Sequence, residues 1–141
     1  MLRKNITGRS KYGNTRFFTE DGQKWDSKKE YKRWLVLKDA EDEGLITNLR
    51  RQVVFELIPS IKETYVEHLK TKDKIKERVV QRPISYTADF CYTKDGQEVA
   101  EDVKASPNAA ALDKTFLIKE KLFRWKFGFP ITRVYKPTDK F

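Results

Sequence analysis

The sequence predicts a single α/β domain that contains a mixed β-sheet and whose elements follow the order α-β-β-β-α-β. Three features indicate this class: a capped helix early in the chain, a β-hairpin with a two-residue turn, and a later helix followed by a short strand. A length of 141 residues suits one domain. We therefore divide the chain into a basic arm over residues 1–24 and one domain over residues 25–141, which carries a charged insertion at about 60–82.

The first helix is predicted to begin near Ser27, because Ser27 and Glu30 have the spacing of a capping box. Gly44 is suited to end this helix, since glycine readily adopts the left-handed conformation that follows many helices. The large apolar residues along the helix are Tyr31, Trp34, Leu35 and Leu37. Glu30 has two roles open to it: it can return a hydrogen bond to the helix start, and it can also line a cleft.

The remaining elements follow from β-branched runs, turns and helical spacing. They are strands over residues 49–58, 84–93, 97–104 and 131–135, and a helix over roughly Ala110 to Phe127. Asp95-Gly96 is a strong signal for a two-residue hairpin turn. Residues 60–82 are dense in Lys and Glu and allow a helical excursion, a β-arm or a mobile loop. Their excess of basic residues suits a DNA-contacting insertion, whereas a solvated charged loop is the commoner outcome.

The hairpin register brings two carboxylates together. A two-residue turn pairs Lys94 with Gln97, and the same register then places Asp89 directly opposite Asp102. Opposite Cβ atoms lie ~5 Å apart, so two such acids repel each other. A divalent cation such as Mg²⁺ compensates this repulsion, and Lys104 adds positive charge on the same strand face. The other interpretation is a solvated polar face on which Lys104 neutralises its neighbours.

Side-chain alternation agrees with this register. The apolar face is expected to carry Tyr86, Ala88, Phe90, Tyr92, Val99 and Val103. The opposite face is expected to carry Ser85, Thr87, Asp89, Ala100, Asp102 and Lys104. Glu101 falls on the apolar face, where we expect a cation to pair with it.

The charge balance points to a polyanionic partner. The formal net charge is +9 and the sequence pI is about 9.6, values typical of proteins that bind nucleic acid. An anionic membrane surface is the rival partner, but neither terminus shows a basic amphipathic helix. The third interpretation is a basic surface without a function. Cys91 and His68 are single, which excludes an internal disulfide, a His/Cys zinc site and a multi-histidine nuclease motif.

The chain shows neither a signal-peptide pattern nor a long apolar run, so we expect a cytoplasmic protein that does not span a membrane. In the second helix, Leu112, Phe116, Phe123 and Phe127 form one apolar lobe, and Ile118, Leu122 and Trp125 form another. Lys119 falls between these lobes and is a candidate to reach the scissile phosphate, although a snorkelling stem is the commoner explanation. Lys121 and Arg124, with Lys11 and Arg16 in the arm, suit contacts to backbone phosphates.

These motifs together resemble the PD-(D/E)XK nuclease superfamily. The resemblance rests on Asp89, on Asp102-Val103-Lys104 in the partner strand, and on Glu30 in the preceding helix. It extends to a family of small phage-encoded proteins, some of which are regarded as Holliday-junction resolvases. The stretches similar to that family are Lys11-Tyr12-Gly13-Asn14, Asp26-Ser27-Lys28-Lys29-Glu30, Thr87-Ala88-Asp89-Phe90 and Glu101-Asp102-Val103-Lys104. Ala88 stands where the name of the motif has proline, at a position that varies in the superfamily.

The resemblance implies a restriction-endonuclease-like core and hydrolysis of DNA phosphodiester bonds, with branched or junction DNA as the substrate. It implies that Asp89, Asp102 and the carbonyl of Val103 bind Mg²⁺ or Mn²⁺, that Glu30 binds directly or through water, and that Lys104 orients water or stabilises phosphate charge. Junction resolution requires two symmetric cuts, so it further implies a homodimer. A phage-encoded enzyme would act in the cytoplasm of its bacterial host.

A second hypothesis belongs to a different class: a catalytically inactive nucleic-acid-binding module on the same fold. The intact set of Glu30, Asp89, Asp102 and Lys104 favours the enzyme, because an inactive relative is free to lose these residues. Nicking of supercoiled plasmid that depends on Mg²⁺ or Mn²⁺ distinguishes the two hypotheses.

Overall fold

The computed structural model describes residues 16–141, so Lys11 and the stretch Lys11-Tyr12-Gly13-Asn14 lie outside the described residues. The chain forms an α/β domain, as expected, with more elements than the six predicted. In chain order the elements are β1 (Phe17–Phe18), β2 (Lys24–Trp25), α1 (Lys28–Asp42), β3 (Thr47–Ile58), β4 (Ile61–His68), β5 (Asp73–Gln81), β6 (Ile84–Lys94), β7 (Gln97–Val103), α2 (Pro107–Leu112), α3 (Lys114–Phe127) and β8 (Ile131–Val134).

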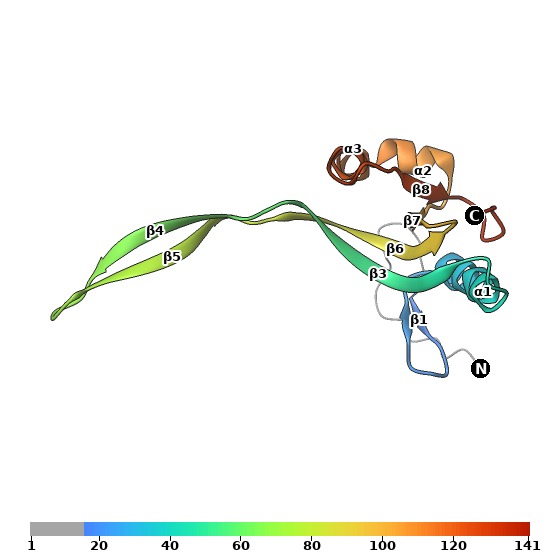
Figure 1. The fold of residues 1–141 in the computed structure, drawn as a ribbon, viewed down its shortest axis with the longest axis horizontal. Helices are drawn as coiled ribbons and strands as arrows, with labels where there is room; N and C mark the ends of the chain where they lie inside the picture. Colours follow the sequence, from blue (N-terminus) through green and yellow to red (C-terminus); the bar gives the residue numbers. More distant parts are fainter. Residues whose placement is uncertain (1–15) are drawn as a thin grey trace.

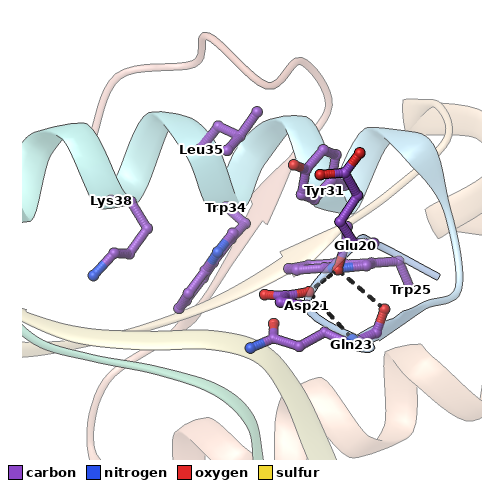
Figure 2. A pocket seen from close by; sticks show the side chains of 9 residues that line it. Glu20, Asp21, Gln23, Trp25, Tyr31, Trp34, Leu35 and Lys38 are labelled. Atoms are coloured by element: carbon purple, nitrogen blue, oxygen red, sulfur yellow. Dashed lines mark hydrogen bonds between the residues drawn. The ribbon is translucent and has the colours of Figure 1, made fainter. Parts of the chain in front are cut away.

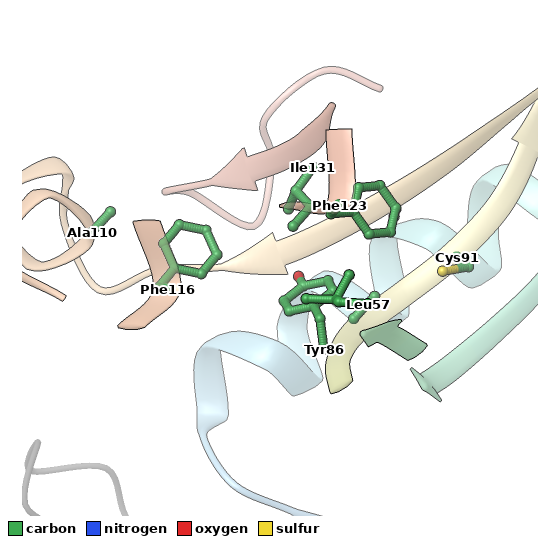
Figure 3. Packing of buried hydrophobic residues seen from close by; sticks show 9 residues of the cluster. Leu57, Tyr86, Cys91, Ala110, Phe116, Phe123 and Ile131 are labelled. Carbon is green, nitrogen blue, oxygen red and sulfur yellow. The ribbon is translucent and has the colours of Figure 1, made fainter. Parts of the chain in front are cut away.

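A mixed sheet of four strands organises the domain, as the sequence predicted. The strand order is β3-β6-β7-β8, in which β7 and β8 are parallel and the other neighbours are antiparallel. Helix α1 lies on one face of this sheet, and α2 and α3 lie on the other (Figure 1). The α1-side cluster consists of Phe17, Trp25, Leu37, Ala40, Ile46, Phe90 and Tyr92. The α3-side cluster consists of Leu57, Tyr86, Ala88, Cys91, Ala100, Ala110, Phe116, Phe123 and Ile131 (Figure 3).

Helix α1 begins and ends where its capping residues predicted. Ser27 is the N-cap, and its hydroxyl oxygen accepts a hydrogen bond of 3.1 Å from the backbone N–H of Glu30. After the helix, Gly44 adopts a φ of 77°, and its N–H donates to the carbonyl of Glu41. The start of α1, and with it Glu30, is therefore fixed by local hydrogen bonds.

The segment expected as one helix from Ala110 to Phe127 is two helices, so that expectation was wrong. Asp113 breaks the helical path with φ −83° and ψ 92°, and its carboxylate accepts from the N–H of Phe116 at 3.1 Å, which caps α3. The break separates Leu112 from the apolar lobe assigned to it and leaves Leu112 80% exposed. Trp125, in the other lobe, is 81% exposed.

Residues 60–82 form a β-arm, one of the three structures that the sequence left open. Strands β4 and β5 pair with each other in a separate two-stranded sheet, which projects far from the domain body (Figure 1). At the other end of the chain, β1 and β2 form a short hairpin inside and just beyond the expected arm of residues 1–24. Phe17 and Trp25 on this hairpin are buried against α1, so this part of the segment belongs to the folded domain.

The side-chain alternation of β6 inverts at Asp89. Tyr86 and Ala88 lie in the α3-side cluster, whereas Phe90 and Tyr92 lie in the α1-side cluster. The expectation that these four side chains share one face was therefore wrong. Asp89 therefore lies between the two clusters, where the side chains of β6 change from one face of the sheet to the other.

Strand β3 inverts at the same level. Leu49 packs on the α1 side and Val53 on the α3 side, and between them Gln52 has a left-handed backbone with φ 52°. A left-handed residue inside a strand reverses the faces of the residues that follow, as it does in a β-bulge. Strands β3 and β6 remain paired on both sides of this level, so both strands invert together.

A buried ion pair joins α1 to β7, and it supplies the cation that we expected beside Glu101. The Arg33 guanidinium donates to both carboxylate oxygens of Glu101, at 2.8 and 2.5 Å, and both side chains are fully buried. Tyr92 donates its hydroxyl to the same carboxylate at 2.6 Å. Arg33 also donates to the carbonyls of Pro137 and Asp139, at 2.9 and 2.5 Å, so the pair also anchors the C-terminal segment.

We expect Glu101→Gln to lower the free energy of unfolding by about 3–5 kcal/mol, because it leaves the Arg33 charge buried without a counter-ion. Urea denaturation measures this loss as a fall in the midpoint. The matched control is Glu98→Gln, since Glu98 pairs with Arg50 where the two side chains are 35% and 39% exposed. This control is expected to lose no more than about 1 kcal/mol. Equal losses in both variants would show that the buried pair has no special role.

Candidate active site

The candidate site lies where β6 and β7 separate, one residue beyond the last pair of their ladder. The observed pairs run from Lys94–Gln97 to Phe90–Glu101, which confirms the predicted register. Asp89 and Asp102 are the next residues on the two strands. The Asp89 carboxylate accepts a hydrogen bond of 2.7 Å from the backbone N–H of Val103, so it bridges the gap between the strands. Asp102 turns toward α3, where Tyr86 donates its hydroxyl to the Asp102 carboxylate at 2.8 Å.

Helix α1 brings Glu30 to these two acids. Lys29, its neighbour, donates its ammonium group to the carbonyls of Lys104 and Ala105, at 2.7 and 3.1 Å, and so holds the start of α1 against the end of β7. The Glu30 carboxyl lies close enough to Asp89 for the two groups to change each other's pKa, and the charge of Asp102 also acts on Glu30. Three acids from a helix and two strands therefore share one site.

Burial and mutual repulsion raise the pKa values of two of these acids. Burial raises the pKa of Asp89 well above its usual range, and the negative charges of Asp102 and Glu30 raise it further. Burial also raises the pKa of Glu30, with the charge of Asp26 as the next cause. The contact between Glu30 and Asp89 is therefore best satisfied when they share a proton or when a cation joins them.

Lys104 lies beside the acids, as expected. Its ammonium group is 2.9 Å from a carboxylate oxygen of Asp102 and 3.6 Å from the centroid of the Phe116 ring. The side chains of Lys104 and Asp102 are 18% and 11% exposed, so the pair is largely screened from solvent but still reachable from it. Lys104 thus supplies a fixed positive charge at the edge of the site.

Two residues at the site were not singled out from the sequence. Tyr86 was assigned to the apolar face; its ring packs in the α3-side cluster, and its hydroxyl also donates to Asp102. Arg51 places its guanidinium 3.5 Å from the centroid of the Trp25 ring and donates to the carbonyl of Lys24. Its charge lowers the pKa of Glu30, against the raising effect of burial. Both residues are identified only by contacts between distant segments.

The three acids offer only oxygen donors, which suits a hard divalent cation such as Mg²⁺ or Mn²⁺. Within residues 16–141, no three His, Cys, Asp or Glu side chains stand in an arrangement ready to hold a metal ion. Asp102 is engaged by Tyr86 and Lys104, and Asp89 by the N–H of Val103. The donor chemistry of the three acids fits such a cation.

The residues expected to contact phosphate are distributed over the domain. Lys121 and Arg124 are exposed on α3 and line a shallow hollow together with Arg133, whose guanidinium is paired with Glu120. Lys119 is half-buried on the same helix. Arg16 lies 3.5 Å from the carboxylate of Asp26 and hence close to the start of α1.

Comparison with known families gives one match. The family described as Protein of unknown function (DUF1064) matches residues 9–136, which is most of the chain. Neither the curated proteins nor the solved structures contain a match to this chain. Among the described residues, no helix has the length and apolar character needed to cross a membrane.

We expect Asp89→Asn to raise the melting temperature of the protein near neutral pH when a chelator is present. The pKa of Asp89 is higher in the folded state than in the unfolded state, so the folded state binds more protons between these two values. Its ionisation therefore costs stability progressively as the pH rises through that window. Asparagine removes this cost and keeps an oxygen that can accept from Val103.

Thermal melts at several pH values check this expectation. The gain should be a few degrees near neutral pH, since about 1 kcal/mol corresponds to ~4 °C in a domain of this size. It should vanish below about pH 3.5, where both the folded and the unfolded carboxyl are protonated. The matched control is Asp39→Asn, an exposed position on α1 for which no such gain is expected. A rise in melting temperature at every pH, or in the control alone, would contradict the inference that ionisation of Asp89 destabilises the folded state.

Proposed function

The chain belongs to the DUF1064 family, and we propose that it is a metal-dependent endonuclease that hydrolyses phosphodiester bonds in DNA. One observation carries the proposal: Glu30, Asp89 and Asp102 meet beside Lys104 at the open end of a hairpin. Repelling acids in a shared site are costly to stability, and such sites are concentrated where proteins perform chemistry. The formal net charge of +9 adds the affinity for a polyanionic substrate.

The acids Asp89, Asp102 and Glu30, with the backbone carbonyl of Val103, would hold Mg²⁺ or Mn²⁺. A divalent cation bound there supplies a water of lowered pKa and neutralises charge on the phosphate. Lys104 is positioned by Asp102 and Phe116, so its ammonium group can orient that water or stabilise the phosphate oxygens. Tyr86 fixes the orientation of the Asp102 carboxylate through its hydroxyl.

The proposal includes a restriction-endonuclease-like core. The elements α1, β3, β6, β7, α3 and β8 follow the order α-β-β-β-α-β, with β1, β2, β4, β5 and α2 as additions. What supports this part is that Asp89 on β6, Asp102 on β7 and Glu30 on α1 are the acids to which the resemblance assigns metal binding. The proposed substrate is branched or junction DNA, and the proposed setting is the cytoplasm of a bacterial host cell if the chain is phage-encoded.

A catalytically inactive DNA-binding module is the alternative function. Its support is that Asp102 is already engaged by Tyr86 and Lys104, which can serve as a purely structural network. The cost of placing Glu30 close to Asp89 argues for the enzyme, because a structural network gains nothing from two acids that repel each other.

We expect Asp89→Asn and Asp102→Asn each to reduce cleavage of DNA by more than about 100-fold in Mg²⁺ while binding is largely retained. The measurement is nicking of supercoiled plasmid, followed by a panel of labelled junction, flap, duplex and single-stranded substrates. Asp39→Asn, the same chemical change at an exposed site, is the control and should cut at the wild-type rate. Wild-type cleavage by either site variant would refute the assignment of the active site.

Binding to DNA is expected to weaken steeply with salt. Each phosphate neutralised by the protein contributes about −0.9 to the slope of log K against log salt concentration. Several such contacts predict a loss of about 100-fold or more between ~50 and ~200 mM salt. Asp102→Asn protein in fluorescence anisotropy measures this slope without cleavage, and Lys121→Gln should make it shallower by about 1. An affinity that is insensitive to salt would contradict phosphate-dominated binding.

A homodimer is expected if the substrate is a junction with two symmetric strands to cut. The β-arm offers an interface, because Val66, Ile75 and Val79 share one of its faces and are 51%, 76% and 53% exposed. Sedimentation at micromolar concentration should show a dimer, and Ile75→Asp should shift it toward monomer. Lys74→Asp, on the opposite face, is the control. A chain that stays monomeric even on junction DNA would refute junction resolution and leave the nuclease proposal intact.

A further inference from the structure

A hollow of about 490 Å³ lies beside α3, where the helix meets the segment around β8. Three basic side chains line this basic hollow: Lys121 and Arg124 come from α3, and Arg133 comes from β8. Glu120 is the one acid among the described residues that line it. The basic hollow therefore holds more positive than negative charge.

Two of these positive charges are not neutralised by the protein. Arg133 donates to both carboxylate oxygens of Glu120, at 2.7 and 2.6 Å, so these two charges cancel each other. Lys121 and Arg124 are exposed, and neither has an ion-pair or hydrogen-bond partner within residues 16–141. They are three residues apart on α3, and like charges at such neighbouring positions destabilise a helix. An anion placed between the two cations would remove that cost.

The basic hollow adjoins the candidate active site. The Lys104 ammonium group and the Arg133 guanidinium carbon lie 3.6 and 5.6 Å from the centroid of the same ring, that of Phe116. In the parallel pair of β7 and β8, Arg133 is also the register partner of Asp102. The edge of the basic hollow is therefore one aromatic ring away from the ammonium group beside the acids.

We propose that the basic hollow binds a backbone phosphate of the same DNA strand whose neighbouring phosphate lies at Lys104. The inference rests on the endonuclease function proposed above and adds to it the path of the strand, which passes Phe116 and continues along α3. Successive phosphates of one strand follow each other about every 3.4 Å of helix axis, so a strand held at Lys104 offers its next phosphates to Lys121 and Arg124. A recessed site with free cations suits a phosphate group, because charge-assisted hydrogen bonds to phosphate are the strong ones.

Glu120 gives this proposal a signature that general attraction between opposite charges does not have. Glu120→Gln removes the negative charge from the basic hollow and frees the Arg133 guanidinium for phosphate. We expect DNA to bind about three-fold more tightly to this variant. Glu43→Gln makes the same change at an exposed acid that ends α1, and it should alter the affinity little. An equal change in the two variants would overturn the proposal, since net charge alone would then explain binding.

The first experiment measures the affinity of the full chain for a labelled four-way DNA junction by fluorescence anisotropy, with a chelator to prevent cleavage. Lys121→Gln and Arg124→Gln should each weaken binding about five- to ten-fold at ~100 mM salt. The matched control is Lys140→Gln, an exposed residue next to Phe141, which packs against the α1-side cluster. This control should bind as the wild type does. Equal affinities of the control and the two variants would overturn the proposal.

A double-mutant cycle tests the path of the strand. Each junction of a series carries one methylphosphonate, which replaces a charged phosphate by a neutral group. At the phosphate held in the basic hollow, the losses from the methylphosphonate and from Lys121→Gln should not add. The position that fails to add with Lys104→Gln should lie on the same strand, within about two nucleotides. Additive losses at every position, or two positions on different strands, would overturn the proposal.

Two controls identify the source of the phosphate. Cosedimentation with vesicles of phosphatidylglycerol and phosphatidylcholine that Lys121→Gln abolishes would overturn the proposal in favour of a membrane surface. Displacement of the junction by inorganic phosphate, but not by chloride of equal ionic strength, would overturn it in favour of a free phosphate. The nuclease function is tested separately: wild-type binding by the Lys121 and Arg124 variants would exclude the subsite, while loss of cleavage in Asp89→Asn would still support the nuclease.

Discussion

The buried ion pair between Arg33 and Glu101 is the interaction on which the rest of the domain depends. It attaches α1 to the central strand β7, and through the carbonyls of Pro137 and Asp139 it also holds the segment after β8. Because Glu101 and Asp102 are neighbours on β7, the strand that anchors the helix also presents an acid to the site. Glu30 lies one turn before Arg33 on α1, so the same pair fixes the position of the third acid.

The candidate site is a place where the protein tolerates unfavourable electrostatics. Burial and mutual repulsion raise the pKa values of Asp89 and Glu30, and the contacts from Val103 and Lys104 offset this only in part. Such strain persists only where the surrounding structure is rigid. Here the rigidity comes from Lys29, which holds the helix start to the end of β7, and from the ion pair one turn further along α1.

The β-arm lies outside the two core clusters and gains little stability from them. Strands β4 and β5 pair only with each other, and two-stranded hairpins are marginally stable in water by themselves. One face of this β-arm is covered by charged pairs, Glu67 with Lys76 and Glu63 with Arg78, whereas the other exposes apolar side chains. The β1–β2 hairpin, by contrast, is tied to α1 through the contact of Trp25 with Tyr31, and it forms one wall of a hollow that Trp25, Tyr31 and Trp34 line (Figure 2).

The sequence by itself determined the features that depend on neighbouring residues. Ser27 and Gly44 set the ends of α1, Asp95-Gly96 set the hairpin register, and that register brought Asp89 and Asp102 to adjacent places. The alternation of side chains along β7 also indicated that Glu101 needs a cation. It could not identify Arg33, which lies 68 residues away in the chain.

Only the tertiary structure decided the features that depend on contacts between distant segments. The inversion of β6 at Asp89 accompanies the left-handed Gln52 on the neighbouring strand, so strict alternation assigned Tyr86 to the wrong set of neighbours. The break at Asp113 arises because a side chain that caps the next helix competes with continuation of the previous one. Arg51 joins the site through Trp25 and the β1–β2 hairpin. Local patterns fix periodicity and turns, whereas the partner across a sheet or beneath a helix is set by packing.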